Sequence, residues 1–312
     1  MEVPLVVRLR NWVGEAVLSL PALWRLEAAG YSLRLIGRVW AQALFEGQGW
    51  PLVAPPSPLT GSVHVLRQLR RRLAAESPAF ASWPRAMLLT SSFSSALATR
   101  LAGFRLTGYA AEARSILLER AYASPQVEHV AHAYWHLVGL FLGEHKPFPH
   151  ALRALEPTPL QRRRAAERLA SAGLSTGEFV VLCPFSGQSD RAFTKVWPQF
   201  PQLAWHLSTR GLKIVLCPGP AEEHRARELF PGAIHLDGVD LGEYGAILGI
   251  AHTVVANDTG PGHLAAAVGA RLVSVYGPAS LACWAPLGRR VRLIHGSDDW
   301  PTLDAISSAV LA

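Results

Sequence analysis

The chain has 312 residues, of which 50% are hydrophobic and only 17% are charged, and its formal net charge is +7. Such a composition can bury a full core and argues against intrinsic disorder, and the length suits one large α/β domain or two domains. The three cysteines are far apart and no C-x-x-C motif exists, so neither a disulfide framework nor a zinc site is expected.

The charge is unevenly distributed along the chain. Residues 1–156 carry 16 basic and 10 acidic residues, whereas residues 157–312 carry 14 and 13. A basic first half points to an acidic partner such as nucleic acid, an anionic membrane surface or a phosphorylated substrate, although an Arg-rich composition can also spread charge without a function. No stretch reaches the roughly 18 apolar residues of a membrane span, and the N-terminus lacks signal-peptide features, so a cytoplasmic location is expected.

The first half alternates short apolar runs with helical patterns, which predicts βαβ units and a parallel sheet. Strands are predicted at 4–9, 32–36, 86–89 and 104–108, and helices at 15–29, 62–76, 93–102 and 126–142.

A cluster of four prolines at 147–159 predicts a boundary between a domain of residues 1–155 and one of residues 156–312. In the second half, strands are predicted at 179–183, 213–216, 233–235, 253–256 and 272–276, with helices at 198–209, 221–229, 241–250 and 262–268. This order predicts a doubly wound parallel sheet that binds ligands at the carboxyl ends of its strands. A last helix at 301–311 has the option of packing back on the first domain.

The strongest chemical signal is the segment that follows the predicted strand at 253–256. A helix begins near Pro261 there, and two glycines allow a ligand to approach the backbone closely. Free amides and the positive end of the helix dipole favour an anion, most naturally a diphosphate, over an ordinary capped helix with a surface histidine. The candidate residues, including a possible cap and a donor to phosphate, are Asp258, Thr259, Gly260, Gly262 and His263.

A second polar loop follows the predicted strand at 179–183 and contains Ser186, Thr194 and Lys195. Because its strand belongs to the same sheet, Lys195 is expected at the same edge as Thr259, where an ammonium group can neutralise a phosphate. Most loop lysines are merely exposed, but the chain has only three, which favours a function for this one.

A third signal is Glu15, which lies in the first turn of the predicted helix that follows the first strand. A carboxylate there is a reasonable general base if it reaches a substrate proton. The helix dipole alone also favours an acidic residue at this position.

Several other mechanisms are not supported by the sequence. There is no G-x-G-x-x-G after the first strand, no Walker P-loop and no H-E-x-x-H. No D-x-D pair is present to hold a metal against a nucleotide diphosphate, so a metal-independent mechanism without other cofactors is expected. The tryptophans are not interleaved with basic residues as in a platform for single strands, so no nucleic acid is expected as a partner.

Taken together, these segments resemble the lipopolysaccharide heptosyltransferases of glycosyltransferase family 9, most closely the heptosyltransferase II branch. The resemblance covers most of the chain. It is carried in the first half by residues 12–15, 92–97 and 107–109, and in the second half by residues 184–198, 257–267 and 275–278.

The resemblance implies an α/β chain with a GT-B fold, in which two Rossmann-like, doubly wound domains face each other across a cleft. The N-terminal domain would bind the acceptor and the C-terminal domain the nucleotide sugar. The implied reaction is an inverting transfer of heptose from ADP-heptose to an acidic lipopolysaccharide inner-core glycolipid. A peripheral contact with the inner membrane would suit such an acceptor.

The resemblance also implies site residues. Glu15 matches the family's catalytic acidic position, which is usually Asp, and the extra methylene lengthens its reach. Lys195 would stabilise the departing diphosphate. The residues implied for nucleotide-sugar binding are Ser186, Thr194, Lys195, Glu222, Asp258, Thr259, Gly260, Gly262 and His263, and those implied for acceptor binding are Arg10, Trp12, Ser92, Ser94 and Tyr109.

Other functions remain open at this point. Within the same class, heptose or another sugar could be transferred to a protein or a capsule glycan. A non-catalytic nucleotide-binding protein could keep the same fold, although the presence of both Glu15 and Lys195 argues against it. Nucleic-acid binding would predict an affinity that falls steeply with salt and does not respond to ADP.

Overall fold

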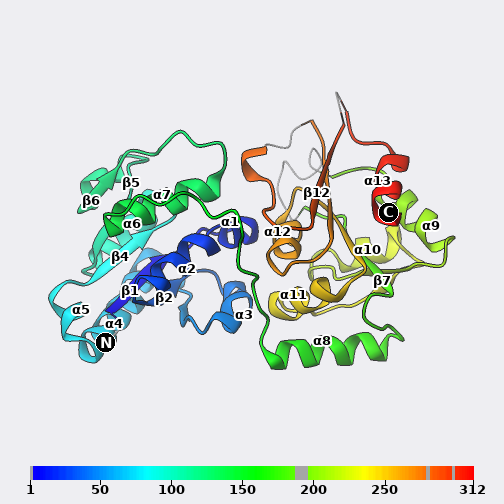
Figure 1. Cartoon of the computed structure of the whole chain (residues 1–312). Helices are drawn as coiled ribbons and strands as arrows, with labels where there is room; N and C mark the ends of the chain where they lie inside the picture. The colour runs from blue at the N-terminus through cyan, green and yellow to red at the C-terminus, as the bar shows by residue number, and fades with distance from the viewer. Residues whose placement is uncertain (1–2, 187–195, 279–281, 297–298) are drawn as a thin grey trace. The chain divides into compact units, whose positions relative to one another are not determined.

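The computed structural model describes residues 3–186, 196–278, 282–296 and 299–312. These residues form two compact units, one made of Met1–Gln42 and Gly49–His150 and the other of Ala43–Gln48 and Ala151–Ala312 (Figure 1). The main division lies a few residues before the boundary that the prolines suggested. The short segment Ala43–Gln48, which belongs with the second unit, was not anticipated from the sequence.

The first unit is built on a six-stranded parallel sheet with the order β3-β2-β1-β4-β5-β6. Its strands are β1 (Val3–Arg8), β2 (Tyr31–Ile36), β3 (Leu52–Val53), β4 (Arg85–Leu88), β5 (Arg105–Tyr109) and β6 (Arg120–Tyr122). The four predicted strands are all present. The two that sequence patterning missed, β3 and β6, are the edge strands, and they are too short to show an alternation of apolar and polar residues.

The helices of the first unit pack on both faces of its sheet. They are α1 (Val13–Leu18), α2 (Leu20–Ala28), α4 (Leu59–Glu76), α5 (Pro78–Ser82), α6 (Phe93–Leu101) and α7 (Val130–Leu142), with the 3-10 helix η2 (Arg114–Leu117). Helix α3 (Trp40–Phe45) begins in the first unit and ends in the segment Ala43–Gln48 of the second, which also contains the 3-10 helix η1 (Glu46–Gln48). Helices α4, α5 and α6 share one hydrophobic core with the strands, while α7 packs against α2 and β5.

One predicted helix of the first unit differs from the structure. The helix expected at 15–29 is two helices, α1 and α2, which meet at Ser19. Pro21 has no amide hydrogen to continue the helical bonding pattern, and the Ser19 hydroxyl donates to the Ala16 carbonyl oxygen (2.7 Å). The break leaves α1 as a short helix that carries Glu15 directly behind the end of β1.

The second unit repeats this architecture with a parallel sheet of order β12-β11-β10-β7-β8-β9. Its strands are β7 (Phe179–Cys183), β8 (Lys213–Leu216), β9 (Ile234–His235), β10 (Thr253–Asn257), β11 (Leu272–Tyr276) and β12 (Val291–His295). The five predicted strands are present, and β12 is additional. It is an edge strand with mostly exposed side chains, so it lacks the apolar run that identified the others.

The helices of the second unit are α8 (Pro159–Ser171), α9 (Phe200–Ser208), α10 (Glu223–Leu229), α11 (Leu241–Ile250), α12 (Gly260–Ala267) and α13 (Leu303–Leu311), with the 3-10 helix η4 (Ala282–Trp284). Side chains of α9, α10 and α13 form one core with the sheet, and α11 packs against α8 and α12. Because Ile306, Ala309 and Val310 of α13 lie in that core, the C-terminal helix completes its own unit.

The two sheets have the same doubly wound strand order. In each, the order reverses between the first and the fourth strand of the unit, which are β1 and β4 in one sheet and β7 and β10 in the other. Ligands of such sheets bind beyond the carboxyl ends of the strands at this reversal. We call the line of strand ends on that side the carboxyl edge of each sheet, and the predicted site residues follow strands that end there.

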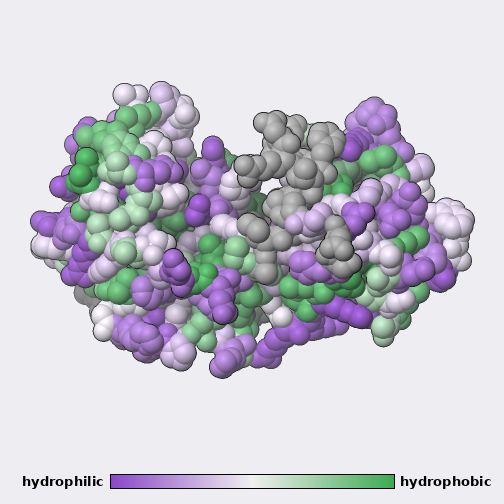
Figure 2. Space-filling view, turned by 90° about the horizontal axis from the view of Figure 1, so that it is seen from above, coloured by the Kyte–Doolittle hydropathy of each residue, from purple (hydrophilic) through white to green (hydrophobic). Residues whose placement is uncertain are grey.

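The surface and helix lengths add two observations. On the face drawn in Figure 2, hydrophilic and hydrophobic residues are interspersed. In the part of the chain that the structure describes, no helix combines the length and the apolar character needed to cross a bilayer.

Candidate active site

The second sheet brings two of the predicted segments together. Strands β7 and β10 are parallel neighbours, and Cys183 at the end of β7 is paired with Ala256 near the end of β10. The segments that leave these strands, which carry Ser186 and Thr259, therefore start side by side at the carboxyl edge. Two stretches more than 70 residues apart in sequence thus form one local site.

Asn257, the last residue of β10, joins these segments. Its side chain is fully buried. The amide nitrogen Nδ2 donates to the Pro184 carbonyl oxygen (2.8 Å), and the Trp197 backbone N–H donates to Oδ1 (3.0 Å). Trp197 is itself held in the core, where its indole N–H donates to the Pro301 carbonyl oxygen (2.9 Å). Sequence reasoning assigned Asn257 no role, although it stands in the motif that carried the resemblance.

Asp258 and Thr259 lie where the sequence placed them, between β10 and α12. Asp258 is buried, and Oδ1 accepts a hydrogen bond from the Tyr276 hydroxyl at the end of β11 (3.3 Å). Burial and this carboxylate together raise the pKa of Tyr276, which keeps its hydroxyl a donor. Asp258 is thus a carboxylate held at the carboxyl edge by Tyr276.

The N-terminus of α12 has the local geometry expected of an anion site. Thr259 occupies the N-cap position that the sequence offered it, but its side chain accepts no capping hydrogen bond. The hydroxyl instead faces the Asn257 carbonyl oxygen at 3.4 Å. The Thr259 side chain therefore does not cover the first amides of α12, and the free amides of a helix N-terminus are what bind an anion.

Gly262 and His263, which the sequence placed beside a bound ligand, lie against the protein's own core. A Cβ atom at Gly262 would lie 3.2 Å from the Asn257 carbonyl oxygen, so glycine is needed there for close contact between α12 and β10. His263 is buried in the first turn of the helix, which excludes the alternative of an ordinary surface histidine. Gly260 begins the helix and is half-buried.

Of the other residues predicted to bind the nucleotide sugar, the structure describes Ser186 and Glu222. Ser186 is half-buried and lies three residues beyond Cys183, the end of β7. Glu222 lies beyond β8 at the N-cap position of α10, and Oε2 accepts a hydrogen bond from the Gly219 backbone N–H (3.0 Å). Thr194 and Lys195 lie outside the described residues.

In the first unit, Arg10 and Glu15 form an ion pair at the end of β1. Nε of Arg10 lies 3.0 Å from Oε1 of Glu15, and the Glu15 side chain is 15% exposed. Burial raises the pKa of Glu15, while the charge of Arg10 and its hydrogen bond act against that rise. A carboxylate that is partly desolvated and has one oxygen paired is well suited to accept a proton on the other.

Three further arginines at this carboxyl edge were missed by sequence reasoning. Arg8 ends β1, and burial and the charge of Arg38 lower its pKa. Arg114 in η2 is fully buried; its guanidinium donates to the carbonyl oxygens of Tyr109 (2.9 and 2.7 Å) and Thr90. Arg8 could have been found from its position at the end of a predicted strand. Arg114 could not, because its role depends on contacts with Tyr109 and Thr90 that form only in the folded chain.

The predicted acceptor residues lie at the same edge, with different surroundings. Trp12 is 65% exposed at the N-cap position of α1. Ser92 caps α6 by accepting from the Ser95 N–H (3.3 Å), and its hydroxyl lies 2.8 Å from that of the exposed Ser94. Tyr109 ends β5, but its hydroxyl donates to the Ala133 carbonyl oxygen (2.7 Å) and so holds helix α7.

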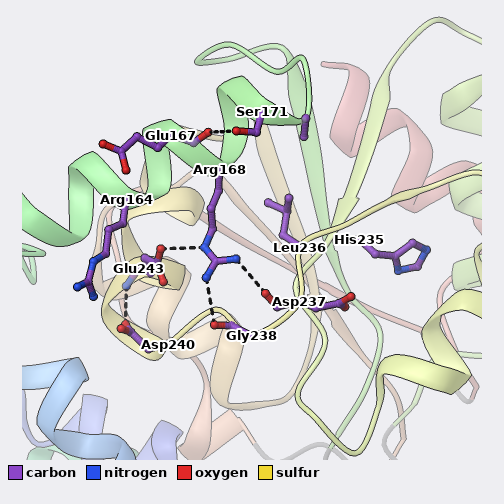
Figure 3. A pocket seen from close by; sticks show the side chains of 11 residues that line it. Arg164, Glu167, Arg168, Ser171, His235, Leu236, Asp237, Gly238, Asp240 and Glu243 are labelled. Atoms are coloured by element: carbon purple, nitrogen blue, oxygen red, sulfur yellow. Dashed lines mark hydrogen bonds and ion pairs between the residues drawn. The ribbon is translucent and has the colours of Figure 1, made fainter.

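A pocket of about 710 Å³ in the second unit lies between α8 and the connection from β9 to α11 (Figure 3). At its centre the Arg168 guanidinium donates to Oε1 of the buried Glu243 (2.9 Å) and to the carbonyl oxygens of Asp237 (3.0 Å) and Gly238 (3.3 Å). The side chains of His235 and Asp237 point away from Arg168 in Figure 3. The charge of Arg168 is thus already bound within the unit, where it holds the segment that follows β9 in place.

Among the described residues, no group of three or more His, Cys, Asp or Glu side chains is arranged to hold a metal ion.

Comparison with known proteins agrees with this arrangement. Two curated relatives are the lipopolysaccharide heptosyltransferases 2 of Escherichia coli (25% identical) and Salmonella typhimurium (30% identical), and each alignment covers 91% of this chain and 86% of the relative. Among solved structures, E. coli ADP-heptose LPS heptosyltransferase II has a TM-score of 0.77 at 21% identity, covering 100% of this chain and 99% of that one. A glycosyltransferase family 9 protein from Veillonella parvula has a TM-score of 0.79 at 18% identity, covering 95% and 87%.

These likenesses confirm the α/β GT-B fold class that the sequence predicted. The family model described as glycosyltransferase family 9 (heptosyltransferase) matches residues 67–307, well over half of the chain. The chain therefore belongs to glycosyltransferase family 9, the heptosyltransferase family, and is a glycosyltransferase.

Proposed function

We propose that this glycosyltransferase transfers heptose from ADP-heptose to an acidic acceptor of the lipopolysaccharide inner core, with inversion at the anomeric carbon and without a metal ion. The names of its relatives supply the sugar, the donor and the pathway. The observation that carries the proposal for the donor is the second carboxyl edge, where the segment with Ser186 and the segment that leads into α12 start from neighbouring strands at the reversal of the strand order.

This edge suits a nucleoside diphosphate for physical reasons. The first amides of α12 and the helix dipole attract negative charge, and His263 lies in the first turn of the same helix. Asn257 fixes the two segments relative to each other, so the donors need little reorganisation when charge develops on the diphosphate. Lys195 would add a compact positive charge in this mechanism.

The first carboxyl edge suits the acceptor. Glu15 would take the proton from the acceptor hydroxyl as its oxygen forms a bond to the anomeric carbon. The bond from that carbon to the diphosphate breaks, and its electron pair leaves with ADP. Arg10 holds one oxygen of Glu15, which leaves the other available to the hydroxyl. Arg8, Arg38 and Arg114 add positive charge to the strand ends and connections of this edge, which would attract an anionic acceptor.

The direct test is to incubate the protein with ADP-heptose and with other nucleotide sugars, and to follow nucleotide release with and without a truncated core glycolipid. We expect ADP release only with ADP-heptose, and strongly increased release with the glycolipid. Glu15→Gln should abolish the glycolipid-dependent release but keep ADP binding, while Glu76→Gln, an exposed carboxylate of the same unit, serves as the matched control. Full transfer by Glu15→Gln would refute the assignment of the base.

The same assay separates the alternatives. Transfer to a protein or a capsule glycan would give ADP release that the core glycolipid does not increase. A non-catalytic nucleotide-binding protein would bind ADP without turnover on any acceptor.

We also propose a peripheral contact of the first unit with the inner membrane. Its carboxyl edge carries exposed apolar side chains, namely Trp12 (65% exposed), Val39 (75%) and Ile116 (83%). Arg38 precedes Val39, so apolar and cationic groups alternate there, which favours an anionic lipid surface. Co-flotation with anionic but not with neutral vesicles is expected, and Val39→Ser with Ile116→Ser should reduce it. Equal flotation with both vesicle types would contradict this proposal.

A further inference from the structure

A hydrogen bond between two buried side chains joins the ends of β10 and β11. The strands are parallel neighbours, and Asn257 of β10 is paired with Val275 of β11. Asp258 directly follows β10 and is 8% exposed, while Tyr276 ends β11 and is fully buried. The Tyr276 hydroxyl donates to Oδ1 of Asp258 (3.3 Å). Tyr276 lies in residues 275–278, which carried the resemblance, but the proposed function gives it no role.

The Tyr276 side chain is fixed by its neighbours. His295 at the end of β12 is paired with Tyr276, and the centroids of the two rings are 4.9 Å apart. A Cβ atom at the next residue, Gly277, would lie 2.7 Å from the Trp300 ring, so the backbone is closely packed there as well. Burial raises the pKa of Tyr276, so its hydroxyl keeps its proton and acts as a neutral donor. A rigid strand end thus presents one donor to one carboxylate oxygen.

The position of Asp258 is unfavourable for binding a diphosphate. Thr259, the next residue, is the N-cap of α12, whose first amides are proposed to bind that anion. A carboxylate and a bound diphosphate repel each other, and burial strengthens the repulsion because little water screens the two charges. Burying the carboxylate also costs free energy unless hydrogen-bond donors compensate for the lost water. Asp258 therefore needs a function towards a part of the donor substrate other than the diphosphate.

The transferred sugar has the chemistry that a carboxylate can bind. Its hydroxyl groups are hydrogen-bond donors, and an ionised carboxylate only accepts. Positive charge develops on the sugar as its bond to the diphosphate breaks, and a fixed negative charge nearby stabilises that positive charge. The same bond links the sugar directly to the diphosphate, so a diphosphate at the start of α12 brings the sugar close to the segment that carries Asp258. The ribose of ADP offers hydroxyl groups too, but it gains no positive charge.

We propose that Tyr276 is a positioning residue, whose hydroxyl holds the Asp258 carboxylate in the orientation that accepts hydrogen bonds from the hydroxyl groups of the transferred sugar. This inference rests on the proposed function, in which ADP-heptose binds at this carboxyl edge. Tyr276 is fully buried and does not touch the donor substrate. It acts through Asp258, and a neutral donor orients the carboxylate without cancelling its charge. The pair thus serves recognition of the sugar and leaves binding of the diphosphate to α12.

The test compares Tyr276→Phe with Tyr244→Phe. Tyr244 is a buried tyrosine of the same unit whose hydroxyl lies 3.0 Å from Sγ of Cys183, so the control also removes one buried hydroxyl contact. Initial rates with saturating truncated core glycolipid give the KM for ADP-heptose, and product inhibition gives the affinity for ADP. We expect Tyr276→Phe to raise the KM about tenfold and to leave inhibition by ADP unchanged, because a misaligned carboxylate affects only the sugar. Tyr244→Phe should leave both quantities unchanged.

A double-mutant cycle separates positioning from packing. In an Asp258→Asn background, Tyr276→Phe should have no further effect on the KM for ADP-heptose, because its effect passes through the carboxylate. A purely structural role would raise the KM by the same factor in both backgrounds and would weaken inhibition by ADP as well. If the Phe variant folds poorly, 3-fluorotyrosine at position 276 takes its place. It is a stronger donor of nearly the same volume, so it should lower the KM for ADP-heptose.

An unchanged KM for ADP-heptose in the Phe or the 3-fluorotyrosine protein would overturn the proposal. Equal losses of affinity for ADP and ADP-heptose would overturn it as well, because they would assign the pair to the nucleotide. Failure of the proposed function has a different signature. In that case the unaltered protein transfers no heptose from ADP-heptose, whichever residue stands at position 276.

Discussion

The most specific structural prediction concerns Asn257, which joins the ends of β7 and β10 to the start of the next segment. In Asn257→Ala, the Pro184 carbonyl oxygen loses the Nδ2 donor, and the Trp197 N–H loses the Oδ1 acceptor. Both groups lie in the buried part of the second unit, so water cannot replace the lost hydrogen bonds without opening the structure. Asn257→Asp tests the same hydrogen bond, because it replaces the Nδ2 donor with a carboxylate oxygen that faces the Pro184 carbonyl oxygen.

The magnitude follows from these two contacts. A buried polar group that loses its partner costs about 1–3 kcal/mol, so two of them predict a loss of about 2–6 kcal/mol in the free energy of unfolding. For a unit of this size, that loss corresponds to a Tm lower by on the order of 10 °C. Because the α12 N-terminus would no longer be held against Ser186, we also expect weaker binding of ADP by the folded variant.

The matched control is Ser274→Ala. Ser274 is fully buried on β11, paired with Ala256 of β10, and its hydroxyl has no partner among the described residues. Removing it should leave stability unchanged or slightly raised. The assays are urea unfolding by circular dichroism and calorimetric titration with ADP at low temperature. If Asn257→Ala unfolds within about 0.5 kcal/mol of the control, the bonds to Pro184 and Trp197 do not hold this edge together.

Three further predictions concern other buried groups. Glu15→Gln should lower the rate of transfer about 10²–10⁴-fold. Burial raises the pKa of Glu15, so at pH values above the ordinary pKa of 4.5 the charged side chain lowers the stability of the fold. The variant should therefore have a higher Tm than the original protein at neutral pH and lose that advantage in acid. A lower Tm at neutral pH would mean that the pair with Arg10 dominates. Arg114→Met removes donors to the Tyr109 carbonyl oxygen and should destabilise the first unit by about 2–4 kcal/mol in urea unfolding; an unchanged midpoint would contradict this. Burial raises the pKa of Cys183 to about 12, so its alkylation in mild alkali should proceed only as fast as the protein unfolds, and rapid native labelling would disprove it.

Sequence patterning found every strand that is long and buried, because such strands are continuous apolar runs between turn residues. It missed β3, β6 and β12, which are short or largely exposed edge strands held by a single neighbour. It also merged α1 and α2, since the apolar periodicity continues through Ser19 although the backbone bonding does not. Local pattern thus predicts the centre of a sheet better than its edges.

The site shows the same division between local and long-range information. Glu15 and the segment at 258–263 could be found because each follows a strand and begins a helix within a few residues. Asn257 could not be found, because its role depends on contacts with residues far away in sequence, namely Pro184 and Trp197. A polar residue in an apolar stretch is the only local sign that it gives.

The two carboxyl edges have the same strand order but different chemistry, and this difference argues for a division of roles. The first edge collects side-chain charge: Arg8 ends β1, Arg10 is paired with the partly buried carboxylate of Glu15, and the charge of Arg10 acts on Arg114. The second edge, as far as it is described, combines the backbone amides of α12, the neutral hydrogen bonds made by Asn257 and one buried carboxylate, Asp258. The positive side chains of the first edge attract a polyanionic acceptor, whereas a diphosphate has a fixed geometry that the backbone amides of a helix can match. The net charge of the first half, which the sequence alone could not assign to a partner, is thus explained in part by the arginines around the proposed base.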